Sequence, residues 1–303
     1  MGIDWSMRIQ IWILTWNNPS DLNEGLSYLF KSNAVSRTDH DININIINNH
    51  SNFKLNDEFV PYVKVWHNSL RPDFSTGHVA RDWNHAIVNG FQNLNSPACD
   101  WLITAHDDTW WGPDWLEIIE DGIVNRGYNF IAAGLGDNIM AFTPEAIKRI
   151  GLFDERFCLV GTYEHDYFFR AALYNSEKSS INDKWHMIDG EPLSAYEWNP
   201  LPRRDEILQR PPVNAIRHGE QMRTRYTVQH MGREFFFHKW GVIQERSSIR
   251  TMLANGIKRP LIYSYMCYPY FEKEIETIFE QKYLWREPYP VHPLPLPNIT
   301  PLY

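Results

Sequence analysis

The sequence is poor in the features that mark secreted, membrane-spanning and nucleic-acid-binding proteins. It has only 3 cysteines in 303 residues, Cys99, Cys158 and Cys267, and their spacing predicts neither a disulfide framework nor a cysteine-bound metal. No apolar run reaches the length of a membrane span, and the first residues lack the pattern of a signal peptide. With 29 Lys and Arg against 37 Asp and Glu, the net charge of −8 argues against nucleic acid as the main partner. We therefore expect a soluble, cytoplasmic protein with no membrane span.

The sequence does contain enough apolar residues for a full core, and many aromatic rings. Hydrophobic residues make up 43% of the chain and aromatic residues 15%, including 13 tryptophans. A chain of this length fits one large domain, or one domain with an appendage. Aromatic side chains often line sugar and base pockets, but more of them belong to ordinary cores.

Strands and helices are predicted to alternate through the first half of the chain. Isoleucines at every second position predict strands at Met7–Trp16 and Asp41–Ile47, and apolar runs predict two more at Pro61–Trp66 and Trp101–Ala105. This alternation predicts an α/β fold in which a mostly parallel sheet is flanked by helices. The apolar residues at helical spacing, which follow the first strand and precede the fourth, are Leu22, Leu26, Leu29 and Phe30, then Val79, Trp83, Ile87 and Phe91.

The second half of the chain is predicted to contain the remaining strands and helices of this domain, followed by a separate extension. Phe130–Phe142 predicts a strand pair broken by glycines, Thr143 and Gly151 bound a helix, and another helix begins near Tyr163. Periodicity is poor from Ser176 to Arg225, which predicts an irregular insertion that could form a lid or an acceptor loop. We therefore assign residues 1–245 to the α/β domain, with the insertion at about 176–225, and residues 246–303 to a helical and proline-rich extension.

Two acidic residues directly follow the predicted fourth strand. The run Trp101–Ala105 ends in His106, Asp107 and Asp108. Open α/β sheets bind ligands at the carboxyl ends of their strands, and adjacent carboxylates repel each other unless a cation neutralises them. The stretch therefore predicts a divalent-metal site for a phosphate-bearing ligand. The alternative interpretation is a solvated turn with a helix cap.

The motifs follow one another in an order that resembles GT-A glycosyltransferases of the family 2 type. The resemblance covers about residues 7–241. His106-Asp-Asp-Thr109 is similar to that family's DxD metal motif, with Asp108 at the last acid and His106 in place of the first. The other matching segments are the strand tips Thr15-Trp-Asn-Asn-Pro19 and Asn48-Asn-His-Ser51, Gly77 with Arg81-Asp-Trp-Asn84, Gly151-Leu-Phe-Asp-Glu-Arg-Phe157, Tyr163-Glu-His-Asp166, His230-Met-Gly232 and Lys239-Trp-Gly241.

The resemblance implies a GT-A fold and a metal-dependent, inverting glycosyltransferase. Such an enzyme moves a sugar from a nucleoside-diphosphate sugar, most commonly a UDP-sugar, to a hydroxyl of a glycan or glycoconjugate acceptor. Asp108 and His230 would hold Mn²⁺ or Mg²⁺, and Asp166 or Glu164 would be the catalytic base, with Asp166 preferred. The residues implied in binding the nucleotide-sugar donor are Thr15, Asn17, Asn48, Asn49, Arg81, Asn84, His106 and Asp107.

The candidate site residues could instead have structural roles, and two functions other than glycosyl transfer stay open. Asn is common in turns, and acids are common as caps at helix N-termini. A sugar-1-phosphate nucleotidyltransferase would share the nucleotide-binding fold, although a Gly-rich, Arg-containing phosphate loop is missing after the first strand. A catalytically degenerate module that binds a nucleotide or glycan without turnover is favoured by His106 in place of an acid.

Overall fold

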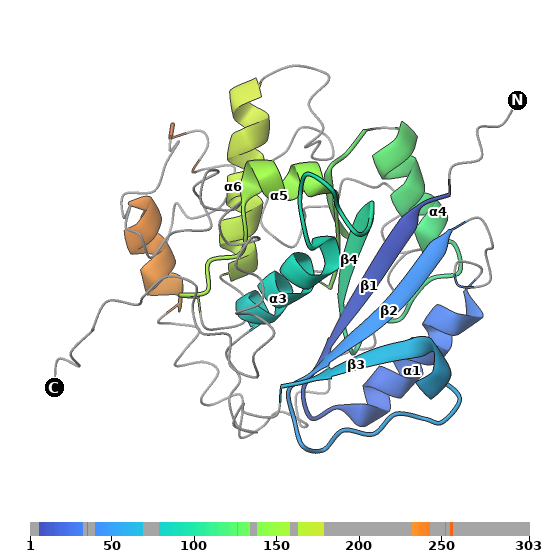
Figure 1. Ribbon diagram of the computed structural model, residues 1–303. Coiled ribbons are helices and arrows are strands. Elements are labelled where there is room, and N and C mark those ends of the chain that lie inside the picture. Colours follow the sequence, from blue (N-terminus) through green and yellow to red (C-terminus); the bar gives the residue numbers. More distant parts are fainter. Residues whose placement is uncertain are drawn as a thin grey trace, which may run out of the picture.

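A six-stranded sheet forms the centre of the structure (Figure 1). The computed structural model describes residues 6–32, 35, 40–68, 79–125, 127–133, 138–157, 163–178, 232–242, 252 and 255–256. The strand order is β3-β2-β1-β4-β6-β5. The strands are β1 (Arg8–Thr15), β2 (Asp41–Asn48), β3 (Val63–His67), β4 (Trp101–His106), β5 (Phe130–Ala133) and β6 (Ile139–Phe142).

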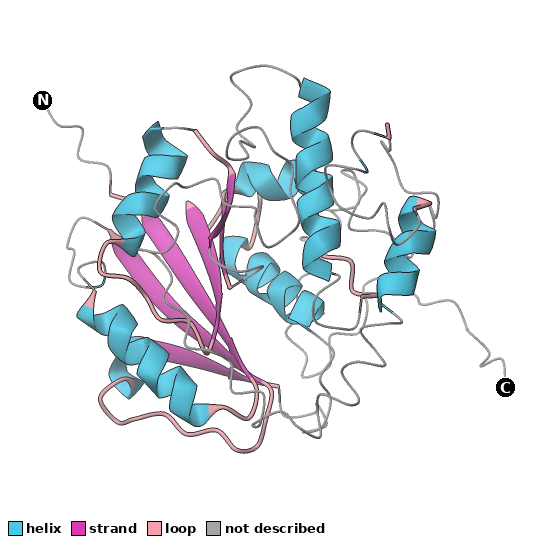
Figure 2. Cartoon of the chain, turned by 180° about the vertical axis from the view of Figure 1, so that it is seen from behind, coloured by secondary structure: helices cyan, strands magenta, loops and turns pink. Residues whose placement is uncertain are grey.

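Four neighbouring strands of this sheet are parallel. β1 pairs in parallel with β2 and β4, and β2 pairs in parallel with β3. β6 runs antiparallel to both β4 and β5, so the predicted strand pair between residues 130 and 142 forms one edge of the sheet. The predicted mostly parallel sheet flanked by helices is confirmed (Figure 2).

Helices cover both faces of the sheet, and two apolar cores lie between them and the strands. One core is shared by the sheet with α1 and α4, and the other by the sheet with α3, α5, α6 and a helix at residues 232–240 (Figures 1 and 2). The bounds are α1 (Pro19–Lys31), a 3₁₀ turn η1 (Val60–Tyr62), α3 (Val79–Phe91), α4 (Trp115–Glu120), a π-helical turn η2 (Asp121–Asn125), α5 (Pro144–Ile150) and α6 (Tyr163–Lys178).

β1 contributes to both cores because successive side chains of a strand point to opposite faces. Ile9, Ile11 and Ile13 pack with α1 and α4, whereas Trp12 and Leu14 pack with α3. A central strand that is buried on both faces is expected in a sheet with helices on both sides.

The signals at the ends of α5 act as predicted. The Thr143 hydroxyl accepts a hydrogen bond from the Ala146 N–H (3.3 Å), which satisfies one of the free donors at the start of the helix. Gly151 follows the last residue with a φ of 89°, a left-handed conformation that suits glycine at a helix end.

The boundary of the predicted insertion is wrong at its first residues. α6 continues through Ser176 to Lys178, because the sequence from residue 163 to 178 contains neither Gly nor Pro to end it. The rest of the predicted insertion and nearly all of the 246–303 extension lie outside the described residues. Within the described residues, no helix is both long and apolar enough to cross a membrane.

Candidate functional site

The carboxyl ends of β1, β2 and β4 meet at one edge of the sheet. In the strand register Leu14 pairs with His106 across β1 and β4, and Thr15 pairs with Asn48 across β1 and β2. β1 has β2 on one side and β4 on the other, so the chain changes direction across the sheet at this point. Open α/β sheets bind ligands in the crevice outside such a switch point. The polar residues after β1 and β4 therefore lie where a ligand site is expected.

Asp107 joins the end of β4 to the end of β1. Its N–H donates to the Leu14 carbonyl (3.1 Å), and its carboxylate accepts from the Thr15 hydroxyl (2.7 Å) and from the N–H of Trp16. Burial, with a further contribution from repulsion by Asp108, raises the pKa of Asp107 to about 7, although the Thr15 hydroxyl opposes the shift. The raised pKa means that the protein only partly compensates the charge of Asp107.

The chemistry of Asp107 and Asp108 fits a divalent cation. Carboxylate oxygens are ligands for Mn²⁺ and Mg²⁺, and a cation beside the pair would lower the pKa that burial and repulsion raise. Within the described residues, no group of three or more His, Cys, Asp or Glu side chains is placed to hold a metal by itself. Further ligands would have to come from a bound phosphate or from a segment outside those residues, which is where His230 lies.

His106 occupies the place of the first acid and packs against α3. Its ring meets the ring of Trp83 edge-on, with the ring centroids 5.3 Å apart, and it is half-buried. The backbone N–H of His106 donates to the Asn138 carbonyl (3.2 Å), which also accepts from the Thr109 hydroxyl (3.3 Å). These contacts anchor the end of β4 to the start of β6, and a nucleotide contact by His106 stays a prediction.

Thr15 and Asn17, at the tip of β1, differ in exposure. Thr15 is buried beneath its bond to Asp107, whereas Asn17 is exposed and adopts a left-handed φ of 51°, which Asn tolerates well. The Asn17 side-chain oxygen accepts a hydrogen bond from the Asn52 amide (2.9 Å), which links the tip of β1 to the loop after β2.

Asn48 and Asn49, at the tip of β2, are both buried and hydrogen-bonded. The Asn48 amide donates to the His50 carbonyl (2.9 Å). The Asn49 amide donates to the carboxylate of Asp82 on α3 (3.0 Å). The structure brings these residues to the same sheet edge as Thr15, where they support the loops around the predicted nucleoside pocket.

Arg81 and Asn84, also predicted to bind the donor, are directed toward the loop after α5. The Asn84 side chain donates to the Phe153 carbonyl (2.8 Å) and accepts from the Phe153 N–H (2.8 Å), and it has no exposed surface. Arg81 pairs with Glu155 (3.2 Å), and Glu155 also accepts from Asn84 (3.0 Å). These residues tie α3 to that loop, so Asn84 offers no surface to a nucleotide.

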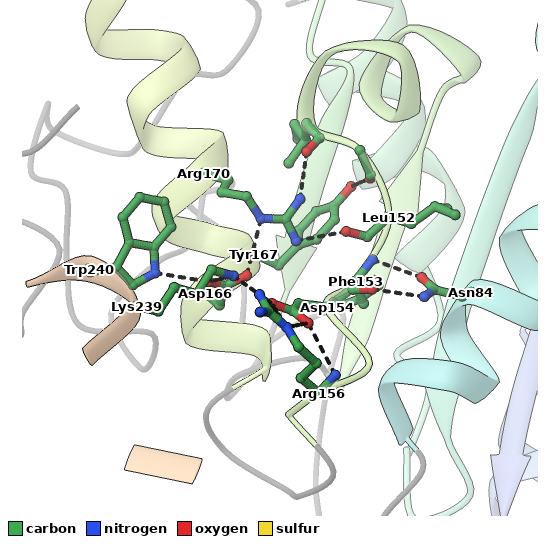
Figure 3. A network of polar contacts seen from close by, with 12 residues as sticks. Asn84, Leu152, Phe153, Asp154, Arg156, Asp166, Tyr167, Arg170, Lys239 and Trp240 are labelled. Atoms are coloured by element: carbon green, nitrogen blue, oxygen red, sulfur yellow. Dashed lines mark hydrogen bonds and ion pairs between the residues drawn. The ribbon is translucent and has the colours of Figure 1, made fainter. Parts of the chain in front are cut away.

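Five charged side chains form a buried cluster that joins three segments of the chain (Figure 3). Lys239 Nζ lies 2.8 Å from Asp154 Oδ2 and 2.6 Å from Asp166 Oδ1, and these three residues have no exposed surface. Arg156 pairs with Asp154 (2.6 Å), and Arg170 pairs with Asp166 (3.1 Å). The cluster connects the loop after α5, helix α6 and the helix at residues 232–240.

Electrostatics in this cluster favour a charged Asp154 despite its burial. Burial acts to raise the pKa of Asp154, but Lys239 and Arg156 outweigh it and hold that pKa below its usual value. Burial lowers the pKa of Lys239, and both carboxylates oppose that shift. Each acid thus has cationic partners within the fold.

The two candidate bases of α6 have different surroundings. Asp166 accepts hydrogen bonds from Arg170 and from the Trp240 indole N–H (2.9 Å), in addition to its contact with Lys239. Glu164 lies two residues earlier in the first turn of α6 and keeps 6% of its surface exposed. Which of the two serves as the base stays a prediction.

The sequence analysis missed Asp154, Lys239 and Asp82 as polar residues with buried partners. Asp166 and Arg170, four residues apart on a helix, were the available signal for one ion pair of the cluster. The pairing of Lys239 with acids 85 and 73 residues earlier in the chain leaves no such local pattern, because the partners belong to different segments.

Two indole nitrogens near the acidic pair are buried without a hydrogen-bond partner among the described residues. They are Nε1 of Trp16, directly after β1, and Nε1 of Trp110, two residues after Asp108. Buried donors are nearly always satisfied in folded proteins, and exceptions often lie where a ligand or water binds. Trp111, by contrast, is part of the core beside α4, so the two adjacent tryptophans have different surroundings.

Comparisons with known proteins find similarity in structure but not in sequence. No protein-family model and no curated protein sequence matches the chain. The mannosyltransferase PcManGT from Pyrobaculum calidifontis, solved with GDP-Man and Mn²⁺, is 12% identical with a TM-score of 0.46; the match covers 76% of this chain and 65% of that one.

Two other solved structures are similarly distant. Glucosyl-3-phosphoglycerate synthase from Mycobacterium tuberculosis, solved with Mn²⁺, UDP and glucosyl-3-phosphoglycerate, is 6% identical with a TM-score of 0.42, over 75% of this chain and 80% of that one. S. aureus TarS, in its 1–349 form, is 13% identical with a TM-score of 0.38, over 55% of each chain. The chain thus spans somewhat less than two thirds of the mannosyltransferase and about half of that TarS fragment.

Proposed function

We propose that the chain is a metal-dependent, inverting glycosyltransferase that moves a sugar from a nucleoside-diphosphate sugar to a hydroxyl of a glycan or glycoconjugate. One observation carries the proposal: the acidic pair Asp107 and Asp108 lies at the switch point between β1 and β4, with a raised pKa at Asp107. The order of the motifs in the sequence supports sugar transfer as the reaction. We expect UDP as the nucleoside diphosphate of the donor.

In this proposal the residues around the switch point hold the donor. Asp108, with Asp107 beside it and His230 from outside the described residues, would hold Mn²⁺ or Mg²⁺. Such an ion supplies stabilisation of the negative charge that grows on a diphosphate leaving group. Thr15 holds Asp107 in place through its hydroxyl, and Asn17 offers the exposed rim of the nucleoside pocket.

We assign the general base to Glu164 in preference to Asp166. A base must reach the proton of the acceptor hydroxyl, and Asp166 has no exposed surface and accepts from three donor groups. Glu164 is also buried, but it keeps 6% of its surface exposed, and because residues two apart on a helix point in different directions it lies on another side of α6 from Asp166. Attack by the acceptor from the side opposite the leaving group gives the inverted product.

The test is release of nucleoside diphosphate from a panel of nucleotide sugars, with Mn²⁺ and then with a chelator. We expect release from one donor that the chelator abolishes. Binding of a donor without release would favour the degenerate binding module. The proposal would be overturned if the protein bound no donor and released nucleoside diphosphate from none.

Two substitutions separate binding from catalysis. Asp108→Asn should abolish metal-dependent nucleotide binding, whereas Glu164→Gln should keep that binding and lose transfer by about 100-fold or more. Glu145→Gln is the matched control, because the Glu145 side chain on α5 is 41% exposed and pairs with Arg149 one helical turn away, apart from the acids discussed above. Transfer by Glu164→Gln at the wild-type rate would contradict the assignment of the base.

A further inference from the structure

Helix α1 lies along the acidic loop, which we define as residues 107–115. Gly25, Tyr28 and Ser32 are spaced three and four residues apart, so they lie on one face of α1 and at its C-terminal cap. Each of the three contacts a different part of the acidic loop. α1 therefore supports the loop over its whole length, on the side away from α3.

The closest of these contacts is between backbones. A Cβ atom added to Gly25 would lie 2.8 Å from the carbonyl oxygen of Thr109 and 3.1 Å from that of Asp107. A Cβ does not come this close to a backbone oxygen, and neither oxygen belongs to a side chain that could rotate away. The missing side chain at Gly25 is thus what allows α1 to touch the loop at Asp107.

The other two contacts hold the rest of the loop. The ring of Tyr28 stacks on that of Trp110, with centroids 5.2 Å apart and planes inclined by 29°. The indole N–H of Trp115 donates to the Ser32 hydroxyl (3.1 Å), in a fully buried bond. On the far side, Asp107 is held by the Leu14 carbonyl and the Thr15 hydroxyl. The loop is therefore clamped between α1 and the end of β1.

We infer that Gly25 is a positioning residue for the acidic pair, which acts by letting the backbone of α1 fix the carbonyls of Asp107 and Thr109. Any larger residue at this position displaces the loop and moves both carboxylates relative to the end of β1, which Asp107 contacts. The inference rests on the proposed function, since it concerns the residues that would hold the metal and nucleotide.

The experiment measures binding of UDP in the presence of Mn²⁺ by calorimetry for the wild type, Gly25→Ala and Gly90→Ala. Gly90→Ala is the matched control, because an added Cβ there meets the Leu102 side chain on the other face of the sheet. We expect roughly ten-fold or greater weakening of binding for Gly25→Ala and unchanged affinity for Gly90→Ala, although both lose stability. Wild-type affinity in Gly25→Ala would overturn the inference.

A second measurement keeps the inference apart from the proposed function. If the wild type binds no nucleoside diphosphate, the proposed function fails, and the loop position is then read from the indole N–H NMR resonances of Trp110 and Trp115 in the metal-free protein. Gly25→Ala should shift these resonances, because both rings contact α1, whereas Gly90→Ala should leave them unchanged. Unshifted resonances in Gly25→Ala would overturn the inference by themselves. If Gly25→Ala does not fold, Tyr28→Leu provides the same test with a smaller expected shift.

Discussion

Two pairs of acids in this domain are neutralised in opposite ways. Asp154 and Asp166 share Lys239, and each has an arginine of its own, so the fold supplies their counter-charges. Asp107 and Asp108 stand side by side at the ends of the strands, where burial and mutual repulsion raise the pKa of Asp107 to about 7. The first pair has its counter-charges within the protein, whereas in the second pair the fold disfavours the charged form of Asp107.

This difference separates acids that hold a fold together from acids that are available to a ligand. A buried carboxylate with cations in contact stabilises the arrangement of the segments that carry those cations. A carboxylate whose pKa is raised gains stabilisation when an external cation arrives. The acids of one domain can therefore be sorted by their counter-charges, without reference to any ligand.

The largest effect is expected from removing one acid of the first pair. Asp166→Asn leaves Lys239 and Arg170 facing one another with less negative charge, so we expect a loss of about 3–5 kcal/mol in the free energy of unfolding. Urea denaturation of the purified variant measures this loss as a lower midpoint. Lys239→Met should lower the free energy of unfolding by less than Asp166→Asn does, because Asp154 and Asp166 each keep an arginine partner. The comparison breaks if Asp166→Asn is as stable as the wild type.

An intermediate effect is expected from pH at the second pair. The folded-state pKa of Asp107, about 7, lies above the ordinary value, so the folded protein binds this proton more tightly than the unfolded chain does. Stability without metal should therefore fall as the pH rises through the range from about 4 to about 7. Over the same range the stabilisation by Mn²⁺ should increase, because the metal binds the deprotonated carboxylate.

Thermal unfolding with and without Mn²⁺, at several pH values across this range, measures both trends. Asp107→Asn is the control, because it removes the titrating group and should flatten the pH dependence of the metal effect. A metal-induced rise in Tm that is equal at about pH 5 and about pH 8 would remove the contrast between the two pairs.

The smallest effect is expected from an ion pair whose charges water already screens. Arg8 and Asp100 form a contact of 2.7 Å, with 48% and 34% of their side chains exposed. Asp100→Asn should lower the free energy of unfolding by about 0.2–1 kcal/mol, as is usual for surface ion pairs. The measurement is again urea denaturation, and a loss comparable to that of Asp166→Asn would show that burial does not set the ranking.

Much of the fold could be predicted because its signals are local. The isoleucine alternation of β1 and β2, the capping threonine of α5 and Gly151 are each read from a few neighbouring residues. The acidic pair was placed correctly at a strand end for the same reason, since an apolar run followed by two acids is a short pattern.

The partners of the polar residues could not be predicted, because they depend on packing between distant segments. Asn84 fits a motif of a donor-binding helix, yet its amide is taken by the backbone of Phe153, 69 residues later. Asp166 fits a motif for a base, yet a lysine from the helix at residues 232–240 reaches it. Sequence patterns identify which residues are polar and buried, whereas only the tertiary arrangement decides what satisfies them.

The cluster around Lys239 also bears on how this domain can change over evolution. It fastens the segment after residue 231 to α6, which closes a loop over the 53 residues from 179 to 231. The entropy of closing a loop grows slowly with its length, so doubling the number of residues costs only about 0.6 kcal/mol. The intervening stretch can therefore be lengthened, shortened or exchanged between lineages at little thermodynamic cost, while the acids at the ends of β1 and β4 stay where they are. If the predicted acceptor loop lies in this stretch, its sequence can diversify separately from the acids of the proposed metal site.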